Sequence, residues 1–331
     1  MKYFILFIIL IIFIIKIFIF KKNSNIKKEK LCIIGGGLSG IISAKQLKKK
    51  YNVTLFDENE TLGGANCWIK YNNKYIDNGV FYLSALKYKN YNIMNILNKY
   101  NIKYKDIEFS FNILNYSKNI YKKEITKFLK ELNENKDNEE IRINDILKNY
   151  DKEFIENYIM PISTIILACD LNLFVSDFYY LSEILPFAFE NKPKWIIPEN
   201  GTYEMIKKLS NDISDLIKLN EKIVSVKNVE NNKIEIINNN NEIYLFDKVV
   251  FCIRFDIINN IYKSPSVEEK QIYSKFKYYN VETIIHTDSS IFENNKISDY
   301  LIYNSKTKNL TIIVDKKNSI YISILKSESI N

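Results

Sequence analysis

Residues 31–64 read LCIIGGGLSGIISAKQLKKKYNVTLFDENETLGG, and this stretch decides the fold. Its first four residues, 31–34, are apolar without a break, which is typical of a parallel strand covered on both faces. Gly35, Gly37 and Gly40 follow at once in a GxGxxG pattern. In this pattern the first glycine makes a tight turn, the second lets a ligand approach the main chain, and the third lets a helix lie close to its strand.

The rest of the stretch completes a βαβ unit. Residues 38–50 form the predicted helix, and residues 52–56 form a second strand that ends at Asp57. The N-terminus of such a helix offers unpaired N–H groups and a positive dipole end to a pyrophosphate. An acid about 20 residues beyond the loop accepts a hydrogen bond from a ribose hydroxyl and repels a 2′-phosphate. The fold class is therefore α/β, with a Rossmann-like dinucleotide-binding domain.

A glycine pair, Gly63 and Gly64, follows the acid at a short distance. With this pair the sequence resembles the flavin-dependent amine oxidase and phytoene desaturase superfamily, in which a pattern VxVxE…GG marks FAD. Asp57 stands where that superfamily usually has glutamate, which keeps the acceptor and shortens its reach. Further segments look like those of a narrower group, the FAD-dependent amine oxidoreductases or predicted NAD/FAD-binding proteins. These segments are Ala65–Asn66, Ile76–Val80, Pro193–Tyr203 and Ile285–Asp288.

The resemblance implies FAD as the cofactor. The residues predicted to bind it are Gly35, Gly36, Gly37, Leu38, Ser39, Gly40, Asp57, Glu58, Gly63, Gly64, Ala65 and Ile223. In the resembled family, a residue at the place of Ile223 contacts the adenine through its main chain. An NAD-dependent dehydrogenase fits the glycine loop equally well, but it leaves Gly63 and Gly64 without a purpose.

The domains are expected to be discontinuous. Residues 31–80 with 200–255 form the predicted FAD-binding domain, and residues 81–199 with 256–331 form an α+β substrate lobe. Helices are expected near residues 88–100, 123–133, 143–159, 176–189 and 203–216, and further strands near 107–114, 222–226, 243–246 and 248–253. In the resembled superfamily the second lobe binds substrate over the flavin ring.

Residues 1–30 are predicted to be a transmembrane anchor with a basic linker. Tyr3 to Phe20 is almost wholly apolar and nearly long enough to span a bilayer as a helix, and Lys16 can snorkel from one end. The basic tract 21–30 then places the C-terminal body in the cytoplasm. A cleaved signal peptide is the alternative, but no small-residue cleavage site follows the apolar run.

Composition limits the remaining function classes. The chain has 331 residues and a net charge of +8, and seven of its lysines lie in residues 1–30, so overall basicity gives no support for nucleic-acid binding. The four cysteines, Cys32, Cys67, Cys169 and Cys252, have no paired spacing, and no metal site is expected. His286 is the single histidine and hence the candidate histidine base. The alternative is a structural residue on a strand of the second lobe.

Together these features predict a membrane-anchored, FAD-dependent oxidoreductase that acts on a small amine or an unsaturated lipid-derived substrate. One departure from the resembled superfamily leaves an alternative open. Its members end in a further glycine-containing stretch that meets the flavin ring, whereas no glycine follows Gly201 here. The alternative is a noncatalytic flavin- or nucleotide-binding membrane protein that depends on a protein partner.

Overall fold

The computed structural model describes residues 28–79, 83–84, 93–107, 111–114, 120–135, 138, 141, 143–161, 195–276, 278, 282–290, 301–304, 309–315 and 319–325. These residues fall into two compact units. The first unit contains the described residues of Met1–Gly64 and Ser210–Phe276, and the second contains those of Ala65–Leu209 and Lys277–Asn331. This division by contacts does not test the predicted boundaries of a cofactor domain and a substrate lobe, which stay predictions.

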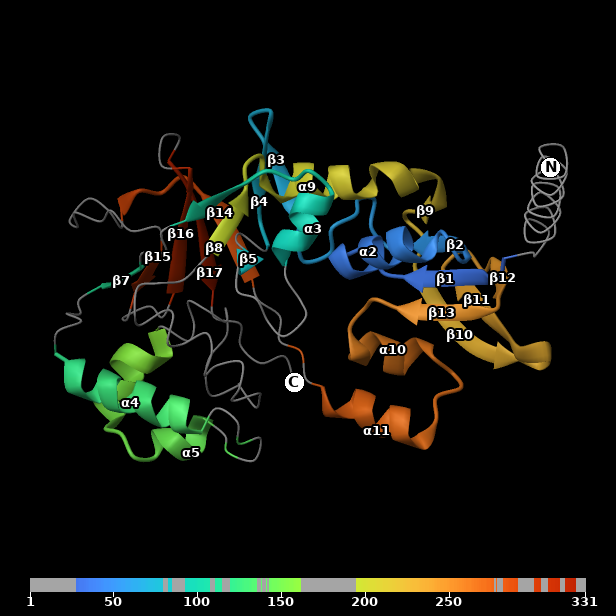
Figure 1. The fold of residues 1–331 in the computed structure, drawn as a ribbon. Coiled ribbons are helices and arrows are strands. Elements are labelled where there is room, and N and C mark those ends of the chain that lie inside the picture. Colours follow the sequence, from blue (N-terminus) through green and yellow to red (C-terminus); the bar gives the residue numbers. More distant parts are fainter. Residues whose placement is uncertain are drawn as a thin grey trace, which may run out of the picture. The chain divides into compact units, whose positions relative to one another are not determined.

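A parallel four-stranded sheet forms the centre of the first unit, in the order β13-β1-β2-β9. Its strands are β1 (Lys30–Ile34), β2 (Asn52–Phe56), β9 (Ile217–Lys218) and β13 (Lys248–Phe251). Helix α2 (Leu38–Leu47) connects β1 to β2 and packs against both, as Figure 1 shows. Four of the five β1 residues are buried, because the sheet is covered on both faces. The predicted α/β Rossmann-like fold is confirmed.

An antiparallel sheet packs against the parallel one within the first unit. Its strands are β10 (Ile223–Val229), β11 (Lys233–Asn238) and β12 (Ile243–Phe246), joined by tight hairpins. Phe56, Val226 and Ile236 belong to one buried apolar cluster that the two sheets share. Helices α10 (Phe255–Ile261) and α11 (Val267–Lys275) follow the last parallel strand.

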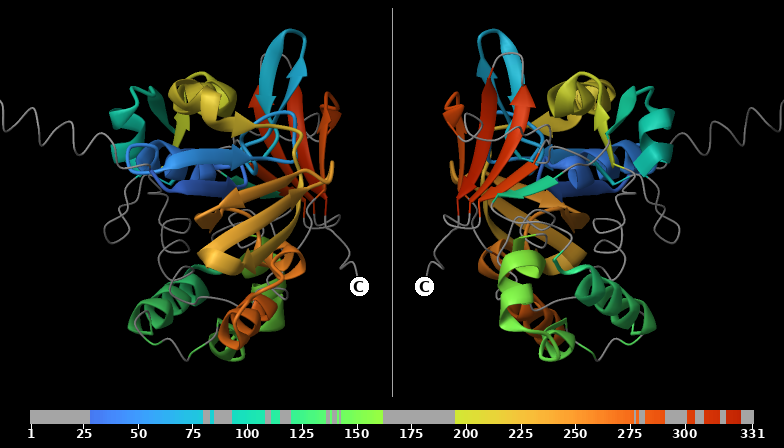
Figure 2. Two further views of the ribbon diagram at one scale, coloured as in Figure 1. Left: turned by 90° about the vertical axis from the view of Figure 1, so that its right-hand side faces the viewer. Right: turned by 90° about the vertical axis from the view of Figure 1, so that its left-hand side faces the viewer.

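The second unit is built on an antiparallel-rich, five-stranded sheet in the order β14-β17-β16-β15-β7, whose C-terminal strands lie side by side in red in Figure 2. The five strands of this sheet are β7 (Phe111–Leu114), β14 (Glu282–His286), β15 (Leu301–Asn304), β16 (Asn309–Asp315) and β17 (Ile320–Leu325). The smaller sheets contain β3 (Trp68–Tyr71), β4 (Lys74–Asp77), β5 (Leu83–Ser84), β6 (Tyr104–Ile107) and β8 (Trp195–Pro198). The helices are α3 (Ile93–Lys99), α4 (Lys122–Glu134), α5 (Ile143–Leu147), α6 (Lys152–Phe154), η1 (Ile155–Ile159) and α9 (Gly201–Ser210).

Two sequence-based expectations are wrong in the second unit. The helix expected over residues 143–159 is broken after α5, because Asp151 has an extended main chain (φ −63°, ψ 141°) and starts a new helix. The strand expected over residues 107–114 is divided between β6 and β7, which belong to different sheets. The helix expected over residues 176–189 lies outside the described residues.

The predicted membrane anchor also lies outside them, since the description begins at residue 28. In the part of the chain that is described, no helix combines the length and the apolarity needed to cross a bilayer.

Candidate dinucleotide site

The turn after β1 brings the glycine loop against its own helix and the neighbouring strand. Gly35 has φ +106°, and a Cβ atom there would lie 2.5 Å from the carbonyl oxygen of Cys252. A Cβ atom on Gly40 would lie 1.8 Å from the carbonyl oxygen of Gly35. Only glycine at both positions lets α2 start this close to β1, and the helix therefore points its N-terminus at the end of the parallel sheet.

The N-terminus of α2 is open. Gly37 is its N-cap, no side chain caps the helix there, and the first turn holds no acidic residue. The first N–H groups of a helix have no intrahelical acceptor, so they remain available to an anion. A Cβ atom on Gly37 would meet only the carbonyl oxygen of Gly63 and the Cα atom of Gly64, both at 3.9 Å. The space over Gly37 is thus sufficient for a ligand to approach the main chain.

The second glycine pair lies directly beside this opening. The Gly63 amide donates to the carbonyl oxygen of Gly36 at 3.0 Å, and Gly63 forms a parallel bridge with Gly37. Gly64 has φ +58°, and a Cβ atom there would lie 3.1 Å from the Cα atom of Gly37. Two glycine-rich segments separated by more than 20 residues therefore form one main-chain cradle.

Asp57 closes the cradle at the end of β2. Its side chain is buried, with 8% exposure of the residue. The Oδ2 atom accepts a hydrogen bond from the Gly36 amide at 2.5 Å, and the Oδ1 atom accepts from the Asn59 amide and side chain at 2.9 and 3.0 Å. A carboxylate has about four acceptor positions, so Asp57 can still accept from a ribose hydroxyl.

The structure brings together eight predicted cofactor residues of the first unit at this place. They are Gly35, Gly36, Gly37, Leu38, Ser39, Gly40, Gly63 and Gly64, with Asp57 beside them. Glu58 is exposed and pairs with Lys222 at 2.8 Å. Ile223 is the first residue of β10, is buried against the parallel sheet, and pairs with Asn238 of β11. Ala65 is exposed and is the first residue of the second unit.

His286 also belongs to the second unit, at the end of β14. Its Nε2 atom lies 2.9 Å from the Ser323 hydroxyl of β17, and its ring lies 5.7 Å from that of Tyr321. The Nδ1 atom is buried and has no hydrogen-bond partner among the described residues. The histidine is thus held within a sheet, and its role as a catalytic base stays a prediction.

The thiols of Cys32 and Cys252, near the cradle, are not activated as nucleophiles. Burial raises the pKa of Cys32 well above its ordinary value, and burial raises that of Cys252 despite an opposing contact from Ser43. Both thiols therefore remain protonated and behave as small apolar side chains. Within the described residues, no three His, Cys, Asp or Glu side chains come together as a metal site.

Several residues around the acid escaped sequence reasoning. Asn59 binds the Asp57 carboxylate through a turn in which the side chain of residue i accepts from the amide of residue i+2. An Asp-x-Asn pattern after a strand is a signal for such a turn. Lys218, Glu221, Asn238, Glu242 and Tyr244 form a polar network next to the acid. Its members fall in two segments, 218–221 and 238–244, and no local pattern connects these segments with each other or with Asp57.

Comparison with known proteins agrees with this geometry. Residues 33–100 match the family model of the NAD(P)-binding Rossmann-like domain. Among curated proteins no match to the chain was found. Several solved structures share the fold. A triple mutant of putrescine oxidase is 14% identical with a TM-score of 0.68, over 91% of this chain and 76% of that one.

Two further structures extend the comparison to other activities. Cyclohexylamine oxidase from Brevibacterium oxydans is 13% identical with a TM-score of 0.68, over 90% of this chain and 74% of that one. The CLA-producing fatty acid isomerase from P. acnes is 12% identical with a TM-score of 0.63, over 90% and 77%. All three structures share the fold that the resemblance to the amine oxidase and desaturase superfamily implies. At these identities the fold alone is shared.

Proposed function

We propose that the protein is an FAD-dependent oxidoreductase of the amine oxidase type. One observation supports this most strongly: the open N-terminus of α2, the Gly63–Gly64 pair and the buried Asp57 carboxylate lie at one edge of the parallel sheet. The open helix end suits the pyrophosphate of a dinucleotide, the glycine pair lets the ligand approach the main chain, and the carboxylate suits a ribose hydroxyl.

The chain's own residues have distinct roles in this proposal. The main chain of Gly37 and the first N–H groups of α2 hold the pyrophosphate, since the space over Gly37 admits phosphate oxygens. Asp57 accepts a hydrogen bond from the adenosine ribose. FAD held there would supply two-electron redox chemistry, and the protein would bind and orient both the cofactor and the substrate.

One feature favours FAD over NAD, and a second disfavours NADP. Gly63 donates to the glycine loop and, with the exposed Gly64, forms a second glycine segment beside Gly37, which a simple NAD-binding unit does not need. The Asp57 carboxylate also disfavours any adenosine with a 2′-phosphate, because the two negative charges would repel each other.

We further propose a small amine or an unsaturated lipid-derived molecule as the substrate. Two proteins with this fold are named as oxidases of amines, and a third as an isomerase of a fatty acid. The apolar run Tyr3 to Phe20 and the basic tract 21–30 support anchoring in a membrane with the body on the cytoplasmic side. Such an anchor would keep the protein next to lipid substrates.

The experiment is to purify the full chain in detergent and record its visible spectrum before and after anaerobic addition of putrescine, cyclohexylamine or an unsaturated fatty acid. The proposal expects a bound flavin, identified as FAD after denaturation, whose absorbance is bleached by at least one compound. Heat-denatured protein is the control for free reduction. Protein that binds FAD without any bleaching would favour the noncatalytic alternative, and folded protein that binds no FAD would overturn the proposal.

A further inference from the structure

The segment 218–222 runs along the residues that follow β2 and supports the acid of the site. The Asp57 amide donates to the carbonyl oxygen of Lys218 at 3.0 Å, and the Glu221 amide donates to that of Asp57 at 3.0 Å. The Asn220 amide donates to the carbonyl oxygen of Asn59, also at 3.0 Å. The main chain on both sides of the Asp57 side chain is therefore fixed to this segment.

The segment has little regular structure of its own to hold it. Strand β9 ends at Lys218 after two residues, and Asn220 has φ +57°. An edge of two residues forms few sheet hydrogen bonds, so its position depends on other contacts. Those contacts come from the hairpin between β11 and β12.

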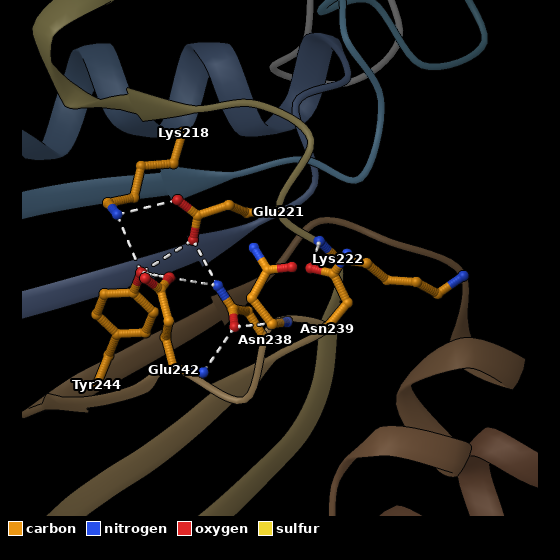
Figure 3. Close-up of polar contacts among 8 residues, drawn as sticks. Lys218, Glu221, Lys222, Asn238, Asn239, Glu242 and Tyr244 are labelled. Atoms are coloured by element: carbon orange, nitrogen blue, oxygen red, sulfur yellow. Dashed lines mark hydrogen bonds and ion pairs between the residues drawn. The ribbon is translucent and has the colours of Figure 1, made fainter.

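Asn238, at the end of β11, is the centre of these contacts (Figure 3). Its side chain is fully buried. The Nδ2 group donates to Glu221 at 3.0 Å and to Glu242 at 2.8 Å, while Oδ1 accepts from the amides of Asn240 and Glu242 at 3.0 and 2.9 Å. An asparagine side chain has two donor hydrogens and two acceptor positions, so every one of them is used.

Tyr244 and Lys218 complete the polar network. The Tyr244 hydroxyl shares its one proton between Glu242 at 2.7 Å and Glu221 at 3.0 Å. Lys218 donates to Glu221 and to Tyr244, at 3.0 Å in each case. Burial alone would raise the pKa of Glu221, but the bonds from Lys218, Asn238 and Tyr244 lower it overall. Both carboxylates thus stay charged around one ammonium group.

Three more contacts link the hairpin to the surroundings of the acid. The Asn239 amide donates to the carbonyl oxygen of Lys222 at 2.8 Å, and the Asn239 side chain accepts from the Lys222 amide at 3.2 Å. The ring of Tyr244 packs on Phe56, the residue before Asp57, with ring centroids 5.2 Å apart. The hairpin therefore touches both the segment 218–222 and the strand that ends at the acid.

We propose that Lys218, Glu221, Asn238 and Tyr244 are positioning residues for the nucleotide. The network holds the segment 218–222 in register with residues 57–59, and so holds the Asp57 carboxylate where it meets the ribose. This inference depends on the proposed function, because it assigns the network to the adenosine end of the same site. A well-supported carboxylate loses less freedom on binding, which increases its preference for a hydroxyl partner.

The test compares ADP with 2′-deoxyadenosine 5′-diphosphate, titrated calorimetrically into the full chain freed of bound nucleotide. In the unmodified protein the ribose hydroxyl is expected to give ADP an affinity about tenfold higher, as for one hydrogen bond to a charged group. Tyr244→Phe keeps the ring on Phe56 and removes the shared proton, so the preference should fall to about twofold or less. Glu221→Gln, which keeps the side-chain shape, should reduce it in the same direction.

Tyr262→Phe is the matched control, since in the described part of the first unit its hydroxyl accepts a hydrogen bond from the Asn228 side chain at 3.3 Å and none from the network. This variant should keep the tenfold preference. A general loss of stability would lower both affinities together and leave their ratio unchanged. Retention of the preference in Tyr244→Phe and Glu221→Gln would overturn the inference alone. A chain that binds neither ADP nor FAD would overturn the proposed function as well.

Discussion

Helices α2 and α9 each have a glycine at the N-terminus, Gly37 as the N-cap of α2 and Gly201 as the first residue of α9, but the two helix ends differ in what lies against them. At α2 no side chain caps the helix and no acid lies in the first turn. At α9 the carboxylate of Asp77 accepts from the Thr202 amide at 3.0 and 3.1 Å and from its hydroxyl at 2.6 Å. One helix end is therefore left for a ligand, and the other is filled by the protein's own anion.

The difference shows that a glycine before a helix does not by itself define a binding site. Burial raises the pKa of Asp77, and the hydrogen bonds from Thr202 offset this rise only in part. A charged carboxylate at the N-terminus of α9 therefore costs some free energy of burial. At α2 no side chain of the described residues lies within 4 Å of the place that a Cβ atom on Gly37 would take.

The largest effect is expected from Gly40→Ala. Its Cβ atom would lie 1.8 Å from the carbonyl oxygen of Gly35, so α2 must move away from β1. We expect a loss of more than about 3 kcal/mol in the free energy of unfolding, measured by urea denaturation, because the clash involves main chain on both sides. A variant as stable as the unmodified protein would show that α2 does not pack this closely.

Asp57→Asn tests the carboxylate that lies beside the open N-terminus of α2. The amide has a single acceptor oxygen, so it cannot serve both the Gly36 and the Asn59 amides as the carboxylate does. The affinity for FAD, measured by flavin fluorescence, should fall about 10- to 100-fold, as for a lost hydrogen bond to a charged group. An unchanged affinity for FAD would show that the ribose does not bind at Asp57.

Asp77→Ala tests the closed helix end. It removes the acceptor from the Thr202 amide and hydroxyl, and the loss of such a cap costs about 1–2 kcal/mol of stability. Thermal unfolding should report this loss, while the FAD affinity of the folded variant should equal that of the unmodified protein. A large drop in affinity would mean that α9, too, serves the cofactor.

The smallest effect concerns the pH dependence of stability that comes from contacts of α2. Asp212 accepts hydrogen bonds from Lys45, which lies in α2, and from Lys48, which is the C-cap of α2. These bonds, the one from Lys45 most, lower the pKa of Asp212 from 3.8 to about 2. The stabilisation is complete above about pH 4 and is lost as the pH falls toward 2.

Asp212→Asn should remove that part of the pH dependence. Its cost near neutral pH should be about 1 kcal/mol, because Asp212 is half exposed and the charges are screened. Urea unfolding at pH 7 and at pH 3 measures both quantities. An equal slope of stability with pH in the variant and the unmodified protein would contradict the assignment.

The sequence predicts the βαβ unit well, because its signals are local. The apolar run of β1, the glycine spacing and the acid after β2 lie within residues 31–64, and the structure places them as a unit. The break at Asp151 was not predictable from apolar spacing alone, since the periodicity continues across it. The contacts of Asp77 with Thr202 and of Glu221 with Asn238 join residues 125 and 17 positions apart. Only the tertiary structure brings such pairs together.

The most direct measurement is the FAD affinity of Gly37→Val beside that of Gly201→Ala. Gly37 has ordinary extended geometry (φ −69°, ψ 179°) and free space, so Gly37→Val should fold normally. Its FAD affinity should fall at least about 100-fold, since the side chain occupies the pyrophosphate position. Gly201 has φ +76°, so Gly201→Ala should lose about 1 kcal/mol of stability and keep its flavin. A folded Gly37→Val protein with the full flavin spectrum would contradict the account.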